Sequence, residues 1–96
     1  MKLSCTNPAL RDMADIHAFI ADQNPGAALK VVRLLRAQAE GLTAHPQMGR
    51  LGRIDGTREL VVSGSAFIIA YRATEATVDI LAIRHGARQW PGQLEE

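Results

Sequence analysis

The chain has few of the features that build disulfide-linked, secreted or membrane-spanning proteins. Its 96 residues include one cysteine, so no intrachain disulfide can form, which suits the reducing cytoplasm. No apolar run approaches the ~18 residues of a membrane helix, and the N-terminus lacks the apolar segment of a signal peptide. We therefore expect a single cytoplasmic domain over residues 1–96, with no membrane partner.

Strong charge is also missing. The net charge is only +1, and proteins that hold nucleic acid by charge alone are usually more basic. The second half of the chain has no lysine, and arginine takes every Lys or Arg position there. A guanidinium group can bind two phosphate oxygens at once. These arginines are Arg50, Arg53, Arg58, Arg72, Arg84 and Arg88.

Familiar metal and nucleotide motifs do not occur. His17, His45 and His85 fall in different predicted elements and form neither HxH nor HExxH, so we expect no metal and no cofactor. The glycine-rich stretch 49–56 lacks the Lys-Ser/Thr pair of a phosphate-binding loop. Cys5 is interpreted as a small buried hydrophobe rather than a nucleophile.

The stretch from 78 to 91 joins an apolar strand to a cationic end. Apolar residues occupy both alternating positions between 78 and 83, which predicts a central strand buried on both faces. The polar and aromatic residues that follow, where the chain surfaces, are Arg84, His85, Arg88 and Trp90.

Strict alternation along this strand separates Arg84 from His85. Arg84 is expected to share a face with Val78, Ile80 and Ala82. His85 is expected on the opposite face, with Leu81 and Ile83. Only one of the two side chains can then join a given site, and the sequence leaves open which one.

Two Asn-Pro pairs mark the expected helix starts. Asn7-Pro8 and Asn24-Pro25 each combine a good N-cap with a residue that fits the first helical turn, and predict helices to about 22 and 43. The expected buried stripe of the first helix is Leu10, Met13, Ile16 and Ile20. That of the second is Ala28, Val31, Val32, Leu35, Ala39 and Leu42. The short connection predicts an antiparallel helix hairpin.

Side chains that alternate between the two faces of an extended chain predict the strands. The expected strands are 2–6, at or near an edge, then 58–63, 67–72 and 77–85, with a long ordered loop over 44–57. We therefore expect an α+β fold. An N-terminal strand and the antiparallel helix hairpin would pack on an antiparallel β-sheet that ends in a three-strand meander.

Residues near the strand ends suit phosphate chemistry if they converge. Guanidinium groups could stabilise a phosphorane, an imidazole could move the proton of an attacking 2'-hydroxyl, and aromatic rings could stack on bases. The candidates are Arg58, Tyr71, Arg72, Arg84, His85, Arg88 and Trp90. The structural alternative is that the arginines solvate the sheet's rim and that the Trp-Pro pair pins the tail to the core.

Several short motifs together carry a family likeness. They are Asn24-Pro25, His-Pro-Gln-Met-Gly-Arg at 45–50, Gly-Thr-Arg-Glu-Leu at 56–60, Ala-Tyr-Arg at 70–72 and Ile-Arg-His-Gly-Ala-Arg at 83–88. With these motifs and this order of elements, the chain resembles the RelE/ParE superfamily of toxins from bacterial type II toxin–antitoxin modules. The likeness covers nearly the whole chain.

The resemblance implies one of two targets. RelE-like members cut messenger RNA on the ribosome, and the catalytic residues implied for this chain are Arg58, Arg72 and His85. ParE-like members poison DNA gyrase and lack that set, and the residues then expected to contact the target or nucleic acid are Tyr71, Arg84, Arg88 and Trp90.

The ParE-like branch is favoured, which would make the chain a binding protein rather than an enzyme. The chain is only slightly basic, and Lys30 is the one lysine in the two predicted helices, whereas a ribosome binder needs cations. A C-terminal helix with a catalytic tyrosine or lysine is not evident. A ribosome-dependent endoribonuclease and an inactive relic stay open as alternatives.

Either branch implies an antitoxin partner. A cognate ParD- or RelB-like antitoxin would cover apolar surface on the helices and sheet in a hetero-oligomer, and operator DNA would be bound only through that antitoxin. The 47% hydrophobic content of a domain this small agrees with an apolar groove for such a partner.

Overall fold

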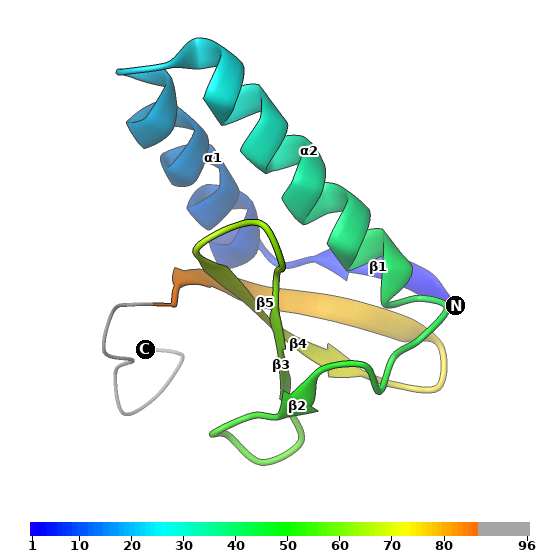
Figure 1. Cartoon of the computed structure of the whole chain (residues 1–96). Helices are drawn as coiled ribbons and strands as arrows, with labels where there is room; N and C mark the ends of the chain where they lie inside the picture. The colour runs from blue at the N-terminus through cyan, green and yellow to red at the C-terminus, as the bar shows by residue number, and fades with distance from the viewer. Residues whose placement is uncertain (87–96) are drawn as a thin grey trace.

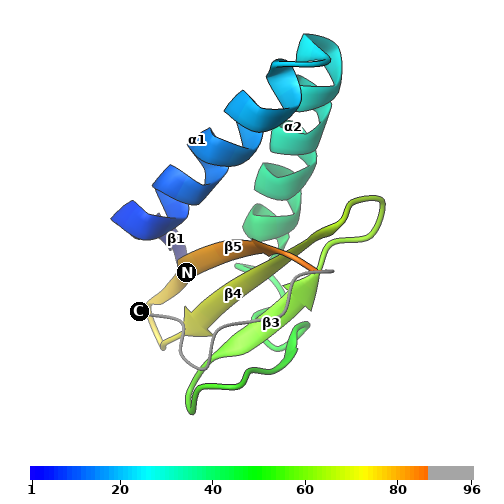
Figure 2. The same cartoon turned by 90° about the vertical axis from the view of Figure 1, so that its left-hand side faces the viewer.

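Two helices lie on one face of a five-stranded sheet in the computed structural model, which describes residues 1–86 (Figures 1 and 2). The elements in chain order are β1 (Lys2–Cys5), α1 (Asn7–Ala21), α2 (Pro25–Gly41), β2 (Arg50–Leu51), β3 (Arg58–Val61), β4 (Phe67–Ala73) and β5 (Thr77–His85). The strand order across the sheet is β1-β5-β4-β3-β2. The predicted α+β class, helix hairpin and meander are confirmed.

The helix starts follow the expected capping chemistry, with one shift. Asn24 caps α2 as predicted, because its side chain accepts a hydrogen bond from the Ala27 N–H at 3.0 Å. The cap of α1 is Thr6 rather than Asn7, and its hydroxyl oxygen accepts from the Ala9 N–H at 3.3 Å. The Thr6 hydroxyl also donates to the Ile80 carbonyl at 3.0 Å, which ties the helix start to β5. No helix within residues 1–86 has the length and apolar character to cross a membrane.

The prediction of an all-antiparallel sheet was wrong at one edge. β1 pairs with β5 in parallel, while the other neighbouring strands pair antiparallel. The helix hairpin separates β1 from the meander, and such a crossover lets two strands align in the same direction. The predicted loop over 44–57 contains β2, an unpredicted two-residue strand at the opposite edge. The predicted turn is present, with Gly64 at φ +82°, and β3 ends earlier than predicted, at Val61.

A register shift in β5 changes which side chains face the helices. Tyr71 of β4 pairs with Ile80 and Ala70 pairs with Ala82, so Leu81 is an extra residue between them. Val78 and Ile80 therefore share the helix-covered face with Ile83 and His85, not with Arg84. Arg84 and His85 do lie on opposite faces, as expected. The predicted neighbours Ala82 of Arg84 and Ile83 of His85 are confirmed, whereas the prediction placed Val78 and Ile80 on the wrong face.

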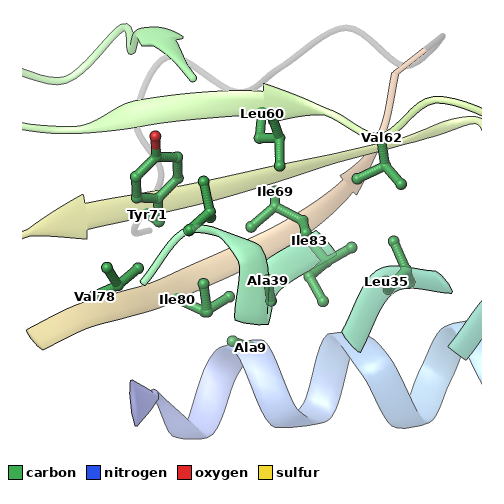
Figure 3. Close-up of a cluster of buried hydrophobic side chains, with 11 residues drawn as sticks. Ala9, Leu35, Ala39, Leu60, Val62, Ile69, Tyr71, Val78, Ile80 and Ile83 are labelled. Carbon is green, nitrogen blue, oxygen red and sulfur yellow. The ribbon is translucent and has the colours of Figure 1, made fainter. Parts of the chain in front are cut away.

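The main core lies between the helix pair and the sheet (Figure 3). It is formed by Ala9, Leu35, Ala39, Leu42, Leu60, Val62, Ile69, Tyr71, Val78, Ile80 and Ile83. Two predicted core residues are exposed instead: Leu10 of α1 and Cys5 of β1. Ala9, next to Leu10 in the chain, takes the buried position at the start of α1 instead.

One carboxylate joins α1 to the part of β5 that extends past β1. The pairing of β1 with β5 ends at Ile80, so the outer edge of β5 beyond it has no strand partner among the described residues. Asp12 Oδ2 accepts a hydrogen bond from the Ile83 N–H at 2.9 Å and from Arg84 Nη1 at 3.0 Å. The helix thus supplies the acceptor that an additional strand would otherwise provide.

We expect Asp12→Ala to lower the free energy of unfolding by about 1–3 kcal/mol, because the Ile83 N–H and the Arg84 guanidinium both lose their acceptor. Urea denaturation followed by circular dichroism measures the change. The control is Asp15→Ala, an exposed position on the same helix, which should change stability by less than about 0.5 kcal/mol. Equal effects of the two substitutions would contradict the proposed anchor.

Candidate functional site

A groove runs between α1 and the end of the sheet where β4 and β5 meet the β3–β4 turn. We call it the α1–β5 groove, and it is lined by Asp12, Asp15, Ile16, Phe19, Ile20, Ala66, Phe67, Ile83, Arg84 and His85. Phe19 is 79% exposed at this groove, an unusual position for a phenylalanine on a small domain. An exposed aromatic ring beside further apolar side chains is typical of a protein-binding surface.

Polar groups surround this apolar surface. The His85 ring meets the Phe67 ring edge to face, with centroids 5.5 Å apart and planes at 78°. Arg84 is already engaged with Asp12, whereas Asp15 is exposed on the same helix. The groove therefore suits an apolar segment that also carries a basic group for Asp15.

Tyr71 is part of the core and not of an exposed site. Its side chain is 0% exposed, and its ring lies among the core residues with the hydroxyl pointing away from α1 (Figure 3). The hydroxyl accepts from the Gly49 N–H at 2.9 Å and donates to the Pro46 carbonyl at 2.8 Å. The prediction that Tyr71 stacks on a base is contradicted, because neither ring face is accessible.

Arg58 also holds the loop over 44–57. Its Nη1 donates to the Gly49 carbonyl at 2.8 Å, so Gly49 is held from both sides, by Arg58 and by Tyr71. A Cβ on Gly49 would lie 2.8 Å from Tyr71 Cε1, which explains why only glycine fits there. The prediction of an ordered loop is confirmed by these contacts, and they give Arg58 a structural role.

The three residues predicted for a nuclease site are not brought together. Arg58 pairs with Tyr71 and His85 pairs with Phe67, so they flank opposite ends of β4. Four strand residues separate these ends by about 13 Å. Arg72 points to the opposite face from both, because neighbouring side chains in a strand alternate. A single reacting atom cannot contact all three groups.

A buried carboxylate that the sequence analysis missed lies on the face away from the helices. Glu59 is 3% exposed, and its Oε1 accepts from Arg50 Nη2 at 3.2 Å. Its Oε2 is buried and has no hydrogen-bond partner within residues 1–86. An unpaired buried acceptor costs about 1–3 kcal/mol, and more for a charged group, so this oxygen calls for a donor.

Two predicted contact residues, Arg88 and Trp90, lie outside the described residues.

Within residues 1–86, no three His, Cys, Asp or Glu side chains gather closely enough to bind a metal. Although Cys5 is exposed, the loss of part of its hydration raises the pKa of its thiol above the usual value, and Arg36 acts in the opposite direction. The thiol is therefore protonated at neutral pH and poorly suited to act as a nucleophile.

Phe19 was also missed, although the sequence contains a usable signal. It lies outside the predicted apolar stripe of α1, so helical periodicity alone places this large aromatic ring in water. Asp12 gave no such signal, because a carboxylate on the polar side of a helix is ordinary. The need for Asp12 arises because β1 ends at Cys5 and leaves the edge of β5 beyond it without a strand partner among the described residues. Asp12 accepts the hydrogen bond from the Ile83 N–H at that edge.

Comparison with known proteins matches the chain to one toxin family. Residues 3–90 match the family model described as ParE toxin of the type II toxin–antitoxin system parDE. The chain is 39% identical over 93 residues to a putative toxin, Y4kP, of Sinorhizobium fredii, which covers 97% of this chain and 96% of the relative. It is 36% identical to toxin RelE2 of Caulobacter vibrioides, over 83% of this chain and 89% of that one.

A solved structure agrees with these sequence matches. The chromosomal ParDE toxin–antitoxin system from P. aeruginosa contains a chain that superposes with a TM-score of 0.80 at 27% identity. The match covers 88% of this chain and 95% of that chain. The fold therefore agrees over nearly the whole domain, including the helix hairpin and the sheet.

We expect Tyr71→Phe to destabilise the protein by about 1–3 kcal/mol, because the buried Gly49 N–H and Pro46 carbonyl lose their shared partner. Chemical denaturation measures the effect. Thr43→Ala is the control, since the hydroxyl bond it removes, to the Glu40 carbonyl, is solvent-exposed and replaceable by water. An unchanged stability of Tyr71→Phe would show that the hydroxyl does not hold the loop.

Proposed function

The chain belongs to the ParE family of toxins from type II toxin–antitoxin systems, and from this premise we propose that it stops growth by binding and poisoning DNA gyrase. In this proposal the toxin acts by contact, and trapped gyrase–DNA complexes, not chemistry performed by the toxin, cause the damage. The observation that carries the proposal is the separation of Arg58, Arg72 and His85.

The positions of these three residues oppose a shared catalytic site. Arg58 bonds to the Gly49 carbonyl, Arg72 lies on the face away from the helices, and His85 packs edge to face with Phe67. A ribonuclease needs its proton-transfer and phosphate-binding groups within reach of one phosphate. The net charge of +1 also supplies little attraction for ribosomal RNA.

A ribosome-dependent endoribonuclease is the second candidate, because one of the relatives carries the name toxin RelE2. Arg72 and His85 are both exposed, so each is accessible to RNA by itself. This candidate requires the bound ribosome to supply or rearrange catalytic groups that the toxin holds apart.

Two assays with the purified chain separate the candidates. We expect linear DNA to accumulate when gyrase, ATP and supercoiled plasmid are incubated with the toxin and the products are released with detergent and protease. We expect no new 5' ends by primer extension on a defined message in cell-free translation. Cuts at codon boundaries that require ribosomes, with gyrase unaffected, would establish the ribonuclease instead.

The α1–β5 groove is proposed as the binding site for an apolar segment of the cognate antitoxin. Phe19 is exposed at 79%, and Ile16, Ile20 and Phe67 extend the same apolar surface. The exposed Asp15 lies at the rim, where a basic residue of the antitoxin would meet it. A central aromatic ring with a charged rim is the arrangement that commonly dominates binding energy.

We expect Phe19→Ser to raise the Kd for the cognate antitoxin at least about tenfold, or ~1.4 kcal/mol, because the partner loses a buried aromatic contact. Leu51→Ser is the matched control, since Leu51 is 78% exposed but lies on β2, at the far edge of the sheet. Titration calorimetry with purified antitoxin gives both values. Similar losses for the two variants, or none for either, would remove the groove as the binding site.

A further inference from the structure

Three large apolar side chains are exposed where β2 and β3 form one edge of the sheet. Met48, Leu51 and Val61 are 52%, 78% and 54% exposed, and we call the surface that they form the β2 edge. In the strand order β1-β5-β4-β3-β2, this edge lies on the far side of β4 and β3 from β5 and the α1–β5 groove (Figure 1). Neither the core nor the groove accounts for these three side chains.

The apolar side chains of the β2 edge project on both faces of the sheet. Leu51 pairs with Arg58, which pairs with Tyr71 of the core, so Leu51 projects on the helix-covered face. Val61 pairs with Ile68 and therefore projects on the opposite face. An extended segment of a partner protein lying beside β2 places its side chains alternately on these two faces, so it can contact both.

The backbone of Leu51 offers a donor and an acceptor at the same edge. The Gly52 N–H donates to the Thr57 carbonyl at 2.8 Å, which makes these two residues a hydrogen-bonded pair. In an antiparallel ladder, such pairs alternate with pairs whose N–H and C=O groups point away from each other. The next pair, Leu51 with Arg58, is of this second kind. The Leu51 N–H and C=O therefore point to the side of β2 that has no strand neighbour within residues 1–86.

The charge at the β2 edge has the opposite sign to that of the α1–β5 groove. The segment 50–59 holds three arginines and two acidic residues, a net charge of +1. One of the acidic residues, Glu59, is 3% exposed, so its carboxylate is not offered at the surface. The charged residues that line the groove sum instead to −1, and they are Asp12, Asp15 and Arg84. A partner segment whose charges complement one of these surfaces does not complement the other.

We propose that the β2 edge is the surface that binds gyrase, an assignment that rests on the function proposed above, and that an extended acidic segment of gyrase pairs with β2 as an additional strand. The apolar side chains of that segment cover Leu51 and Val61, and its backbone pairs with that of Leu51. Its carboxylates meet Arg50 and Arg53, which are both exposed. The exposed apolar side chains favour a protein over DNA at this edge, because contacts to the phosphate backbone are made by cationic and polar groups.

Gyrase-dependent cleavage of plasmid DNA tests this assignment. We expect Leu51→Ser to need at least about tenfold more toxin than the unmodified chain for half-maximal linear DNA, because an apolar contact is lost. Leu51→Pro should need still more, since it also removes the outward N–H at an edge position where proline is tolerated. Leu29→Ser is the matched control, because Leu29 is an exposed leucine in the part of α2 near the connection to α1, away from β2 (Figure 1). Equal losses for Leu51→Ser and Leu51→Pro would remove the strand pairing from the proposal.

A change of charge tests the acidic character of the partner segment. We expect Arg53→Glu to raise the amount of toxin needed at least about fivefold at low salt, and the difference from the unmodified chain to shrink as salt is added. Arg33→Glu makes the same change of charge at an exposed position on α2 and should have no such effect. Circular dichroism verifies the fold of every variant. Leu51→Ser should also keep its affinity for the antitoxin, because the groove lies elsewhere.

The possible failures can be told apart. If the unmodified chain produces no linear DNA with gyrase, the function proposed above fails, and the assignment of gyrase to this edge fails with it. If the unmodified chain produces linear DNA and folded Leu51→Ser and Leu51→Pro do so equally well, only the assignment of the edge is wrong.

Three further results would give the β2 edge to another occupant and overturn the proposal. A loss of antitoxin affinity in Leu51→Ser would assign the edge to the antitoxin. A dimer of the toxin in sedimentation experiments that Leu51→Ser dissociates would assign it to a second copy of the chain. Binding to plasmid without gyrase that Arg53→Glu abolishes and Leu51→Ser leaves intact would assign it to DNA.

Discussion

The extra residue at Leu81 determines how this domain distributes its polar groups. Without it, strict alternation would place Arg84 among the core residues and His85 on the open face. With it, Ile83 completes the core and His85 follows onto the helix-covered face, beside Phe67. Arg84 starts from the opposite face and still reaches Asp12 of α1, which also bonds to the Ile83 N–H. The end of β5 forms one wall of the α1–β5 groove, and the side chains it presents there depend on the extra residue and on the bonds to Asp12.

The extra residue at Leu81 also illustrates which features of the fold the sequence could predict and which it could not. Asn24-Pro25, the alternation of 67–72 and the glycine at 64 each act locally, and the elements they predicted are present. The bulge has no local signature, because Leu81 and Ala82 both fit a buried strand. The parallel β1–β5 pairing is likewise set by where the helix hairpin returns the chain, a tertiary constraint that no short motif records.

The candidate site shows the same division. The residue types of Arg58 and Tyr71 indicated that they could bind phosphate or stack on a base. Residue type alone did not distinguish such a functional group from one that holds a loop in place. Both side chains form hydrogen bonds to the backbone of the loop over 44–57. They meet at Gly49, where the neighbouring atoms leave no room for a side chain larger than that of glycine. In contrast, Phe19 carries no chemistry, and its exposure makes it the stronger functional signal. A toxin that acts by binding needs such surfaces more than it needs convergent titratable groups.

The central proposal is that this toxin acts by binding gyrase, without a nucleolytic site of its own. The most direct measurement is growth after induction, without antitoxin, of the double variant Arg72→Ala/His85→Ala, whose fold is first verified by circular dichroism. Both side chains are exposed, so the substitutions leave the core intact. The account predicts growth arrest as strong as that of the unmodified chain, with cellular messages uncut. Loss of arrest, together with loss of message cleavage that the unmodified chain produces, would contradict it.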